Sequence, residues 1–390
     1  MSVYQLSNQV MNYAWGSTTA IPQLLGRTPD QQQPWAEMWM GAHSKAPSSI
    51  VIDNRWEPLN EWIELHRRQA LGVAAAARFG ELPFLLKVLA VAQPLSLQVH
   101  PNAEQAAEGF SRENSLGIPP GSPIRNYKDP NPKQELLCAL EPFQVMIGFR
   151  PLTETRRLLE RFGLLNEFKL LAGDTSVNPG SFKKFFARLL RADDEHLAWW
   201  IGEALAQAPQ CPERNLVEKL ESHYHADPGV LAPLFLNVQT LQPGEAVFLT
   251  AGVPHTYIEG MGIEVMRCSD NVLRGGLTPK HRDIDELLKT IDWRFEQPSK
   301  TPAVSVSKCE KRYPAPVESF QLSHVQLEGE ALVRQVTSAQ IVLVIEGRCT
   351  LRWGDDKLEL TRGESAFICA TTEQVSLEGR ASLYCAQAPE

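Results

Sequence analysis

Residues 95–101 read LSLQVHP, and this short stretch decides the fold expected for the chain. Apolar and polar residues alternate strictly from Leu95 to His100. Such alternation is typical of a β-strand with one apolar and one polar face. Because residues two apart on a strand point to the same side, Gln98 and His100 are expected to lie together. This pattern suits the mouth of a small β-barrel, where a few polar groups meet in an apolar cavity.

The sequence on either side of this strand predicts further short strands and one early helix. Extended segments are expected at 38–41, 84–91, 95–100 and 135–140. Residues 58–70 carry apolar side chains at helical spacing and predict the helix. A long loop rich in Pro, Gly, Asn and Ser joins His100 to Glu135, with a short helix near 103–110. Loops of this length inside a compact domain often act as lids.

The apolar spacing becomes helical between about 153 and 225, where Phe182 and its neighbours up to Leu190 form one helix face. Strand-like sequence resumes after Pro228, so the helical block is expected to interrupt a β-domain rather than follow it. The tail from about 305 is again rich in short β-segments with glycines between them, which indicates a second jelly roll or sandwich.

We therefore expect a mainly β protein with an all-α insertion, consisting of two jelly-roll β-domains and a helical domain. The predicted catalytic β-domain is discontinuous and comprises residues 1–150 and 231–300. The helical domain is expected at 151–230, and a C-terminal β-domain without metal at 301–390. A chain of 390 residues exceeds what a single hydrophobic core usually holds, which agrees with several domains.

A repeated sequence frame suggests that the two β-domains are related. Segment 244–255, GEAVFLTAGVPH, resembles the second metal motif of cupin β-barrels, except that Thr250 stands at the usual proline position. The tail repeats the frame in 363–374, GESAFICATTEQ, where Gln374 takes the place of His255. We expect the first jelly roll to hold a metal ion and the second to hold none.

Gln98, His100, Glu135 and His255 together offer ligands for one divalent ion. Two imidazoles, a carboxylate and a carboxamide form a mixed set that suits zinc, with iron or manganese next. A single histidine on a strand is more often structural, but the metal-like frame around His255 favours ligation. The neutral amide of Gln98 is a weaker ligand than a carboxylate, so chemistry alone leaves its role open.

Segment 263–283, IEVMRCSDNVLRGGLTPKHRD, is rich in charged residues. Taken alone, such a segment is usually a solvated loop. Its position shortly after the metal-like frame places it near the predicted barrel mouth, where Arg274 or Lys280 is suited to hold a phosphate. Lys87 and Lys133 are close in sequence to the predicted ligands and are expected to add positive potential.

Composition excludes several classes of function. The net charge of −8 argues against nucleic acid as a partner. No stretch reaches the roughly 18 apolar residues that a membrane helix needs, so no membrane partner is expected. The N-terminal sequence does not resemble a secretory signal. Seven cysteines without a CxxC spacing suggest reduced thiols, and a cytoplasmic location is expected.

An ordered series of fragments resembles the type I mannose-6-phosphate isomerase family, also called phosphomannose isomerases. The fragments are NYAWGS (12–17), PWAEMWMGAHSKAPS (34–48), LPFLLKVL (82–89), LSLQVHP (95–101), NYKDPNPKQE (126–135), GVPHTYIEG (252–260) and SDNVLRGGLTPK (269–280). They run along nearly the whole chain. The resemblance implies two cupin-like β-domains with a helical insertion, as the periodicity also predicts.

The resemblance also implies residue roles. It implies one zinc ion (Zn2+) per chain, held by Gln98, His100, Glu135 and His255, and a catalytic Arg274. The residues expected to line the substrate cleft are Trp15, Ser96, Lys133, Tyr257, Glu264 and Lys280. The chain departs from the family's usual Asp-Pro-Asn-His-Lys-Pro-Glu pattern, because Pro132 replaces His and Gln134 replaces Pro. This departure puts in doubt the rigidity of the turn and any role of the missing histidine.

The implied reaction interconverts mannose 6-phosphate and fructose 6-phosphate through an enediol or enediolate. We expect Glu264 to be the general base, with Lys133 as the alternative. Arg274 is expected either to stabilise charge on the reacting oxygens or to hold the phosphate. The expected partner is a small sugar phosphate, and the chain is expected to be a monomer.

Two other functions fit parts of the sequence. An iron-dependent cupin dioxygenase is disfavoured, because such sites usually carry more histidine or a triad of two His and one carboxylate. A non-enzymatic sugar-phosphate-binding cupin would resemble the tail domain, and turnover distinguishes it from an enzyme.

Overall fold

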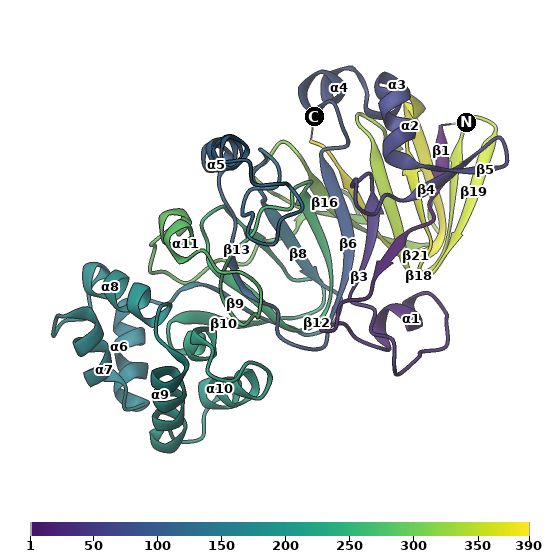
Figure 1. Ribbon diagram of the computed structural model, residues 1–390. Coiled ribbons are helices and arrows are strands. Elements are labelled where there is room, and N and C mark those ends of the chain that lie inside the picture. Colours follow the sequence, from purple (N-terminus) through teal and green to yellow (C-terminus); the bar gives the residue numbers. More distant parts are fainter. Residues whose placement is uncertain (1, 390) are drawn as a thin grey trace.

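The computed structural model describes residues 2–389 and contains two large β-sheets beside a block of helices (Figure 1). The first sheet has ten strands. They are β2 (Gln9–Met11), β3 (Glu37–Gly41), β6 (Phe84–Val91), β7 (Leu97–Val99), β8 (Glu135–Ala139), β9 (Phe143–Phe149), β10 (Leu236–Leu241), β11 (Ala246–Leu249), β12 (His255–Arg267) and β13 (Leu273–Gly276). Strand β12 pairs with β6, β7, β8 and β9, and so brings together segments that are far apart in the sequence.

The second sheet has nine strands and contains most of the C-terminal part of the chain. They are β1 (Val3–Gln5), β14 (Val304–Ser305), β15 (Glu310–Tyr313), β16 (Gln321–Glu328), β17 (Leu332–Gln335), β18 (Gln340–Trp353), β19 (Asp356–Thr361), β20 (Ser365–Ile368) and β21 (Gln374–Gln387). Strand β1 comes from the start of the chain and pairs antiparallel with β20, with Val3 opposite Ile368. A separate two-stranded sheet consists of β4 (Ser49–Ile52) and β5 (Arg55–Pro58).

Five helices form the block that Figure 1 shows at the end of the molecule away from the second sheet. They are α6 (Leu152–Arg161), α7 (Leu165–Ala172), α8 (Pro179–Leu189), α9 (Asp194–Gln207) and α10 (Pro212–His223). The remaining helical segments are α1 (Ala20–Leu24), α2 (Leu59–Leu65), α3 (Arg67–Leu71), α4 (Val73–Phe79), α5 (Ala103–Ser115), α11 (Ile284–Thr290), and the 3-10 helices η1 (Pro228–Leu234) and η2 (Ala370–Thr372).

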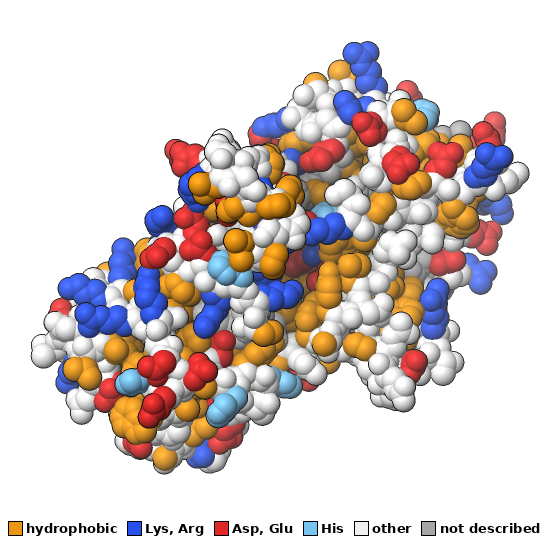
Figure 2. Space-filling view, viewed as in Figure 1, with side chains coloured by type: hydrophobic (Ala, Val, Ile, Leu, Met, Phe, Trp, Pro, Cys, Tyr) orange, Lys and Arg blue, Asp and Glu red, His pale blue; other side chains and the backbone are white. Residues whose placement is uncertain are grey.

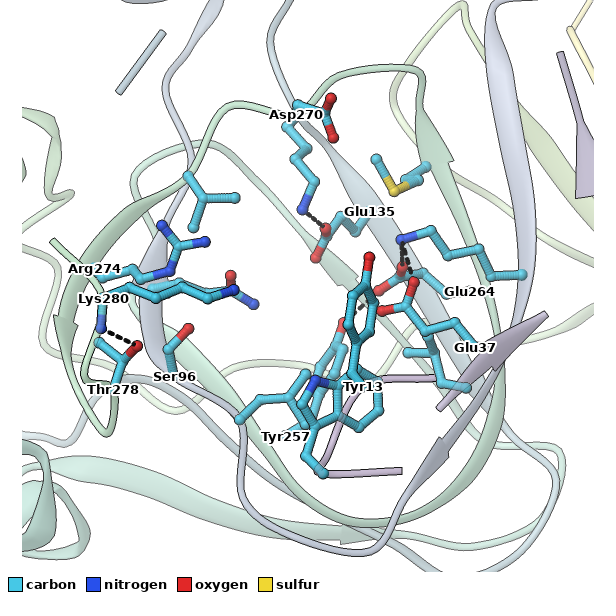
Figure 3. A pocket seen from close by; sticks show the side chains of 18 of the residues that line it. Tyr13, Glu37, Ser96, Glu135, Tyr257, Glu264, Asp270, Arg274, Thr278 and Lys280 are labelled. Carbon is cyan, nitrogen blue, oxygen red and sulfur yellow. Dashed lines mark hydrogen bonds and ion pairs between the residues drawn. The ribbon is translucent and has the colours of Figure 1, made fainter. Parts of the chain in front are cut away.

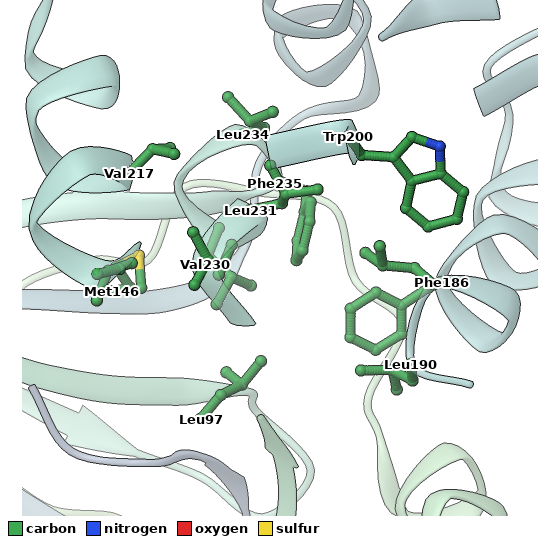
Figure 4. Packing of buried hydrophobic residues seen from close by; sticks show 14 of the residues in the cluster. Leu97, Met146, Phe186, Leu190, Trp200, Val217, Val230, Leu231, Leu234 and Phe235 are labelled. Atoms are coloured by element: carbon green, nitrogen blue, oxygen red, sulfur yellow. The ribbon is translucent and has the colours of Figure 1, made fainter. Parts of the chain in front are cut away.

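Helix α8 shows how local sequence and packing join the helical block to the first sheet. Asn178 and Ser181 form a capping box at its start, which satisfies backbone donors that the helix itself leaves free. On its buried face, Phe182 and Phe186 lie edge-on to Phe149 of strand β9, with ring centroids 5.1 and 5.4 Å away. Phe186 also packs against Phe235 in the cluster of Figure 4. The block is thus attached to the sheet by aromatic packing.

A single apolar core lies between the two large sheets. It contains Leu136 and Ile263 from the first sheet together with Leu322 and Ile341 from the second, all completely buried. Because their side chains belong to one contiguous cluster, the sheets are not separate hydrophobic units. The predicted fold class, mainly β with an all-α insertion and two jelly-roll sheets, is confirmed, whereas the exact domain boundaries stay a prediction.

Several element bounds differ from the expectation. The helix expected at 58–70 is broken at His66, whose ring Nδ1–H donates a hydrogen bond to the Trp62 carbonyl oxygen at 3.0 Å. The strand expected at 95–100 spans only 97–99, because the flanking prolines lack a backbone N–H for the ladder. Helix α5, in the long loop between His100 and Glu135, is longer than expected. None of the described helices combines the length and apolar character that a membrane crossing requires.

Candidate metal centre and catalytic cavity

Three of the predicted metal ligands meet where strands β7, β8 and β12 lie side by side. Glu135 begins β8, His255 begins β12, and His100 follows β7. Their ligand atoms all lie within 4.8 Å of one another, and all three side chains are buried. The Nε2 atoms of His100 and His255 are 3.4 and 3.5 Å from the carboxylate oxygens of Glu135. The cluster is therefore built from segments far apart in the chain, with His255 opposite Gln98 at one end of β12 and Glu135 opposite Met266 near its other end.

Backbone carbonyls orient both imidazole rings. The Nδ1 atom of His100 lies 2.8 Å from the Asn271 carbonyl oxygen, and that of His255 lies 2.9 Å from the Val253 carbonyl oxygen. Since a carbonyl can only accept, each Nδ1 carries the proton and each Nε2 presents a lone pair. Burial, and after it the charge of Lys133, lowers the pKa of His100 to about 3. The ring is therefore neutral, as a metal ligand must be.

The residues fit a divalent metal ion, because two of their buried polar atoms lack any partner. These atoms are Oε2 of Glu135 and Nε2 of His255, which make no hydrogen bond. A buried acceptor without a donor is costly unless an ion or a water molecule satisfies it. Two imidazole nitrogens and a carboxylate form a donor set that zinc prefers.

Lys133 lies next to the cluster and gives it a positive charge. Its Nζ donates to Oε1 of Glu135 and is 3.2 Å from Nε2 of His100. Burial opposes ionisation of Glu135, but the neighbouring charge of Lys133 holds the pKa of this carboxyl group well below its usual range. The site therefore contains an ionised carboxylate that already attracts a cation.

Gln98, the fourth predicted ligand, is placed beside the cluster by its strand register. It lies directly opposite His255 on β12 and opposite Arg274 on β13. Its side chain is half-buried and lines the cavity above the metal cluster. Gln98 therefore lines the same cavity as Glu135, and its role as a ligand stays a prediction.

A cavity of about 520 Å³ opens over the cluster. In the space-filling view a hollow near the middle of the molecule has basic side chains at its edge (Figure 2). All five predicted substrate-binding residues and both predicted catalytic residues line the cavity, namely Trp15, Ser96, Lys133, Tyr257, Lys280, Glu264 and Arg274. The two basic residues Arg274 and Lys280 lie on the opposite side from Glu264, with Glu135 between them (Figure 3). The cavity therefore has a basic and an acidic side.

Glu264 belongs to a buried polar row on the acidic side. Its Oε2 accepts a hydrogen bond from Nζ of Lys87 at 3.1 Å, and its Oε1 accepts one from the Tyr257 hydroxyl at 3.2 Å. Burial raises the pKa of Glu264 above its ordinary value, although Lys87 acts in the opposite direction. A carboxylate whose pKa is raised towards neutrality is a suitable general base.

Asn271, which the sequence analysis missed, connects the metal cluster to the unusual DPNP turn. Its amide nitrogen donates to the carbonyls of Asp129 and Asn131 at 2.8 and 2.9 Å, and its own carbonyl faces His100. Its side chain is completely buried. The turn is therefore fixed by hydrogen bonds that require neither of the two replaced family residues.

The sequence analysis also missed residues that reach the cavity from β3 and from nearby loops. They are Tyr13, Glu37, Trp39, His43, Lys45 and Lys128. Tyr13 stacks on Trp15 with 5.8 Å between ring centroids and is 38% exposed, so it is available to a ligand. The only signal for Glu37 and Trp39 was their alternation with apolar residues in AEMWM, which puts both on one face of a strand.

Comparisons with family models agree with this arrangement. Residues 3–152 match the model described as phosphomannose isomerase type I, catalytic domain. Residues 309–387 match the model described as mannose-6-phosphate isomerase, cupin domain.

Individual relatives cover nearly the whole chain. The mannose-6-phosphate isomerase of Salmonella typhimurium is 41% identical over 384 residues, which is 97% of this chain and 98% of that protein. The human mannose-6-phosphate isomerase is 32% identical over 424 residues, covering 96% of this chain and 95% of the relative.

Solved structures agree in fold over the full length of both chains. A zinc-bound mannose 6-phosphate isomerase superposes with a TM-score of 0.94 at 40% identity, with complete coverage of each chain. The Salmonella typhimurium enzyme bound to fructose 6-phosphate and zinc gives 0.92 at 40% identity, again with complete coverage. The chain therefore belongs to the type I phosphomannose isomerase family.

Proposed function

We propose that this protein is a zinc-dependent isomerase that interconverts mannose 6-phosphate and fructose 6-phosphate. The observation that carries the proposal is the buried cluster of His100, Glu135 and His255, of which Glu135 lines a cavity with a carboxylate on one side and cations on the other. A cavity of about 520 Å³ accommodates a hexose phosphate. Membership of the family and the fructose 6-phosphate held by a relative support the same substrate.

We assign one zinc ion per chain to Gln98, His100, Glu135 and His255. The unpartnered atoms of Glu135 and His255 support this assignment. When bound, zinc supplies a Lewis acid that stabilises negative charge developing on the sugar oxygens.

Glu264 is proposed as the general base of the isomerisation. The carboxylate takes the proton from C2 of the aldose, which moves the C2–H electron pair into a C1–C2 double bond as the C1 carbonyl becomes a hydroxyl. It then returns a proton to C1 while the C2 hydroxyl loses its proton and becomes the ketose carbonyl; this proton balances the one taken up by the C1 oxygen, so no net oxidation occurs. Its raised pKa and its position on the cavity wall support this role. Lys133 remains the alternative proton carrier.

Arg274 and Lys280 are proposed to hold the phosphate on the basic side of the cavity. Their separation from Glu264 in Figure 3 supports a substrate that lies across the cavity floor, with the phosphate at one end and C1 and C2 at the other. Trp15, Ser96 and Tyr257 line the walls between these ends and would orient the sugar. Binding the remote phosphate in this way helps to position the reacting carbons.

The broader properties follow the same proposal. We assign the catalytic β-domain to 1–150 and 231–300, the helical domain to 151–230 and a metal-free β-domain to 301–390. The seven unpaired cysteines suit a reducing, cytoplasmic compartment. The net charge of −8 disfavours nucleic acid as a partner, and no membrane partner is proposed. A monomer is expected, and light scattering coupled to gel filtration measures the mass directly.

The test is to purify the protein, measure bound metal by elemental analysis, and follow fructose 6-phosphate formation from mannose 6-phosphate before and after chelation. We expect close to one zinc per chain, loss of turnover on chelation and recovery on adding zinc. Full turnover by metal-free protein would contradict the zinc assignment. Tight binding of mannose 6-phosphate without product would support a binding protein, and oxygen uptake by iron-loaded protein would support a dioxygenase.

A further inference from the structure

Glu37 is a buried carboxylate in the cavity wall with no role in the function proposed above. It is 8% exposed and lines the cavity. It lies on strand β3, next to β6. In the register of these strands Trp39 faces Lys87, and on the other side of β6 Lys87 faces Glu264 of β12. Glu37 is two residues before Trp39 and so shares its face, which places four polar side chains in one row.

The contacts in this row are specific. Nζ of Lys87 lies 3.6 Å from Oε2 of Glu37 and 3.1 Å from Oε2 of Glu264. The indole N–H of Trp39 donates to the same Oε2 of Glu37, which fixes the carboxylate. The Lys87 ammonium also lies over the Trp39 ring, 5.1 Å from its centroid. Lys87 is therefore held between two carboxylates and an aromatic face.

The buried charge of Lys87 explains why a second carboxylate, Glu37, is needed beside Glu264. Lys87 is only 7% exposed, and a buried ammonium group without a counter-charge is strongly destabilising. With Glu264 as its only partner, Lys87 would lose that counter-charge each time Glu264 took up a proton from the substrate. Glu37 is placed to keep Lys87 paired during this interval.

We propose that Glu37 is a positioning residue for the isomerase reaction, which holds the Lys87 ammonium in place so that Glu264 can gain and lose a proton. The inference rests on the proposed function. Glu37 acts through Lys87 and needs no contact with the reacting carbons.

The direction of a pH effect follows from the groups that face Glu264. They are Lys87 from β6, Glu135 from β8, Glu37 from β3, Tyr257 from its own strand, and Lys133 from the turn before β8. After burial, which raises the pKa of Glu264, Lys87 lowers it and Glu135 and Glu37 raise it. Removing the charge of Glu37 leaves Lys87 with Glu264 as its near partner. Both changes lower the pKa of Glu264.

The experiment compares Glu37→Gln with the wild type over the pH range of activity. The reaction needs ionised Glu264, so activity rises with pH through its pKa. We expect the acid limb of kcat/KM in E37Q to move to lower pH by about half a unit or more. At the plateau kcat should fall by about tenfold, because the base is weaker, while KM changes by less than about threefold.

Two further variants separate positioning from a structural role. Glu37→Asp keeps the charge and is expected to restore the wild-type acid limb, with partial recovery of kcat. Glu160→Gln, which removes a carboxylate from an exposed pair with Arg156 on α6, is the matched control and should leave the profile unchanged. An acid limb in E37Q that does not move, or that moves to higher pH, overturns the inference, whatever happens to kcat. A wild-type protein that does not convert mannose 6-phosphate would instead refute the proposed function.

Discussion

In the first sheet Gly244 precedes strand β11, and in the second sheet Gly363 precedes strand β20, in turns of the same geometry. The two glycines have φ angles of 81° and 85°. The carboxylates of the following residues, Glu245 and Glu364, each accept a hydrogen bond from the backbone N–H three residues earlier, at 2.8 and 2.7 Å. The two sheets thus use the same turn at the start of a four-residue strand.

The residues that follow the two turns differ in burial and surroundings. His255 is 1% exposed and lies opposite Gln98, whereas Gln374 is exposed and lies opposite the exposed Gln335. Within residues 2–389, the cluster around His255 is the single group of three potential metal-ligating residues that was identified. The Gly-Glu turn therefore serves the fold of both sheets, and metal binding depends on which side chains the neighbouring strands place beside the residue that follows it.

The largest effect is expected from His255→Gln, which gives the first sheet the residue of the second. The variant should lose its bound zinc, because one of the ligands is removed. The kcat should fall by at least about 10³-fold, because the zinc ion that stabilises the oxyanion is lost. Elemental analysis and steady-state kinetics measure both changes. Gln374→Ala, the matched change in the second sheet, should leave both at wild-type values. Wild-type zinc content in H255Q would contradict the ligand assignment.

The next effect concerns the ninth residue after each of these positions, which is Glu264 in β12 and the fully buried Leu383 in β21. Glu264→Gln should lower kcat by about 10²-fold or more while zinc stays bound. Burial raises the pKa of Glu264, so in the wild type the carboxylate is lost, and activity falls, as pH decreases through that pKa. The acid limb of the pH–rate profile should therefore disappear in E264Q. A near-normal kcat would transfer the role of base to Lys133.

A smaller effect separates the two glycines. An added Cβ at Gly363 would approach Leu25 Cδ2 to 2.7 Å and the Leu24 carbonyl oxygen to 2.8 Å, whereas at Gly244 its nearest neighbour is the Tyr313 hydroxyl at 4.0 Å. Both substitutions carry the strain of a positive φ, but only one adds a clash. We expect Gly363→Ala to lower the free energy of unfolding by about 3 kcal/mol and Gly244→Ala by about 1 kcal/mol. Denaturant titration measures the difference, and equal losses would show that the second turn relaxes freely.

The smallest effect is expected from Gln374→His, which restores the frame of the first sheet in the second. The new imidazole would stand alone on an exposed strand end, so zinc content should stay at one per chain. The free energy of unfolding should change by less than about 0.5 kcal/mol. Elemental analysis and denaturant titration test this variant. A second equivalent of tightly bound zinc would show that the second sheet still holds a usable site.

Local patterns predicted much of the fold. The bounds of β6 match the expected segment 84–91, and the helical block begins and ends within a few residues of the expectation. Periodicity also put Gln98 and His100 on one side of a strand. Helix breaks such as the one at His66 were not predicted, because a side chain that competes for a backbone carbonyl does not change the spacing of apolar residues.

The parts of the site that escaped prediction depend on contacts between distant segments. Nothing in the sequence near Glu37 indicates that Lys87 will be its neighbour, because the register of β3 against β6 decides this. The sequence around Asn271 likewise gives no sign of its role, because its side chain binds the carbonyls of a turn more than a hundred residues earlier. Motif resemblance led to the predicted set of metal ligands, but it does not reveal the residues that orient them.

The pairing of β1 with β20 also has a consequence for biosynthesis. Val3 is synthesised more than 360 residues before its partner Ile368. At translation rates of about 5 to 20 residues per second, the first strand waits roughly 20 to 70 s for a place in its sheet. During that time its apolar side chains stay available to chaperones, and this pairing can form only after Ile368 has been synthesised.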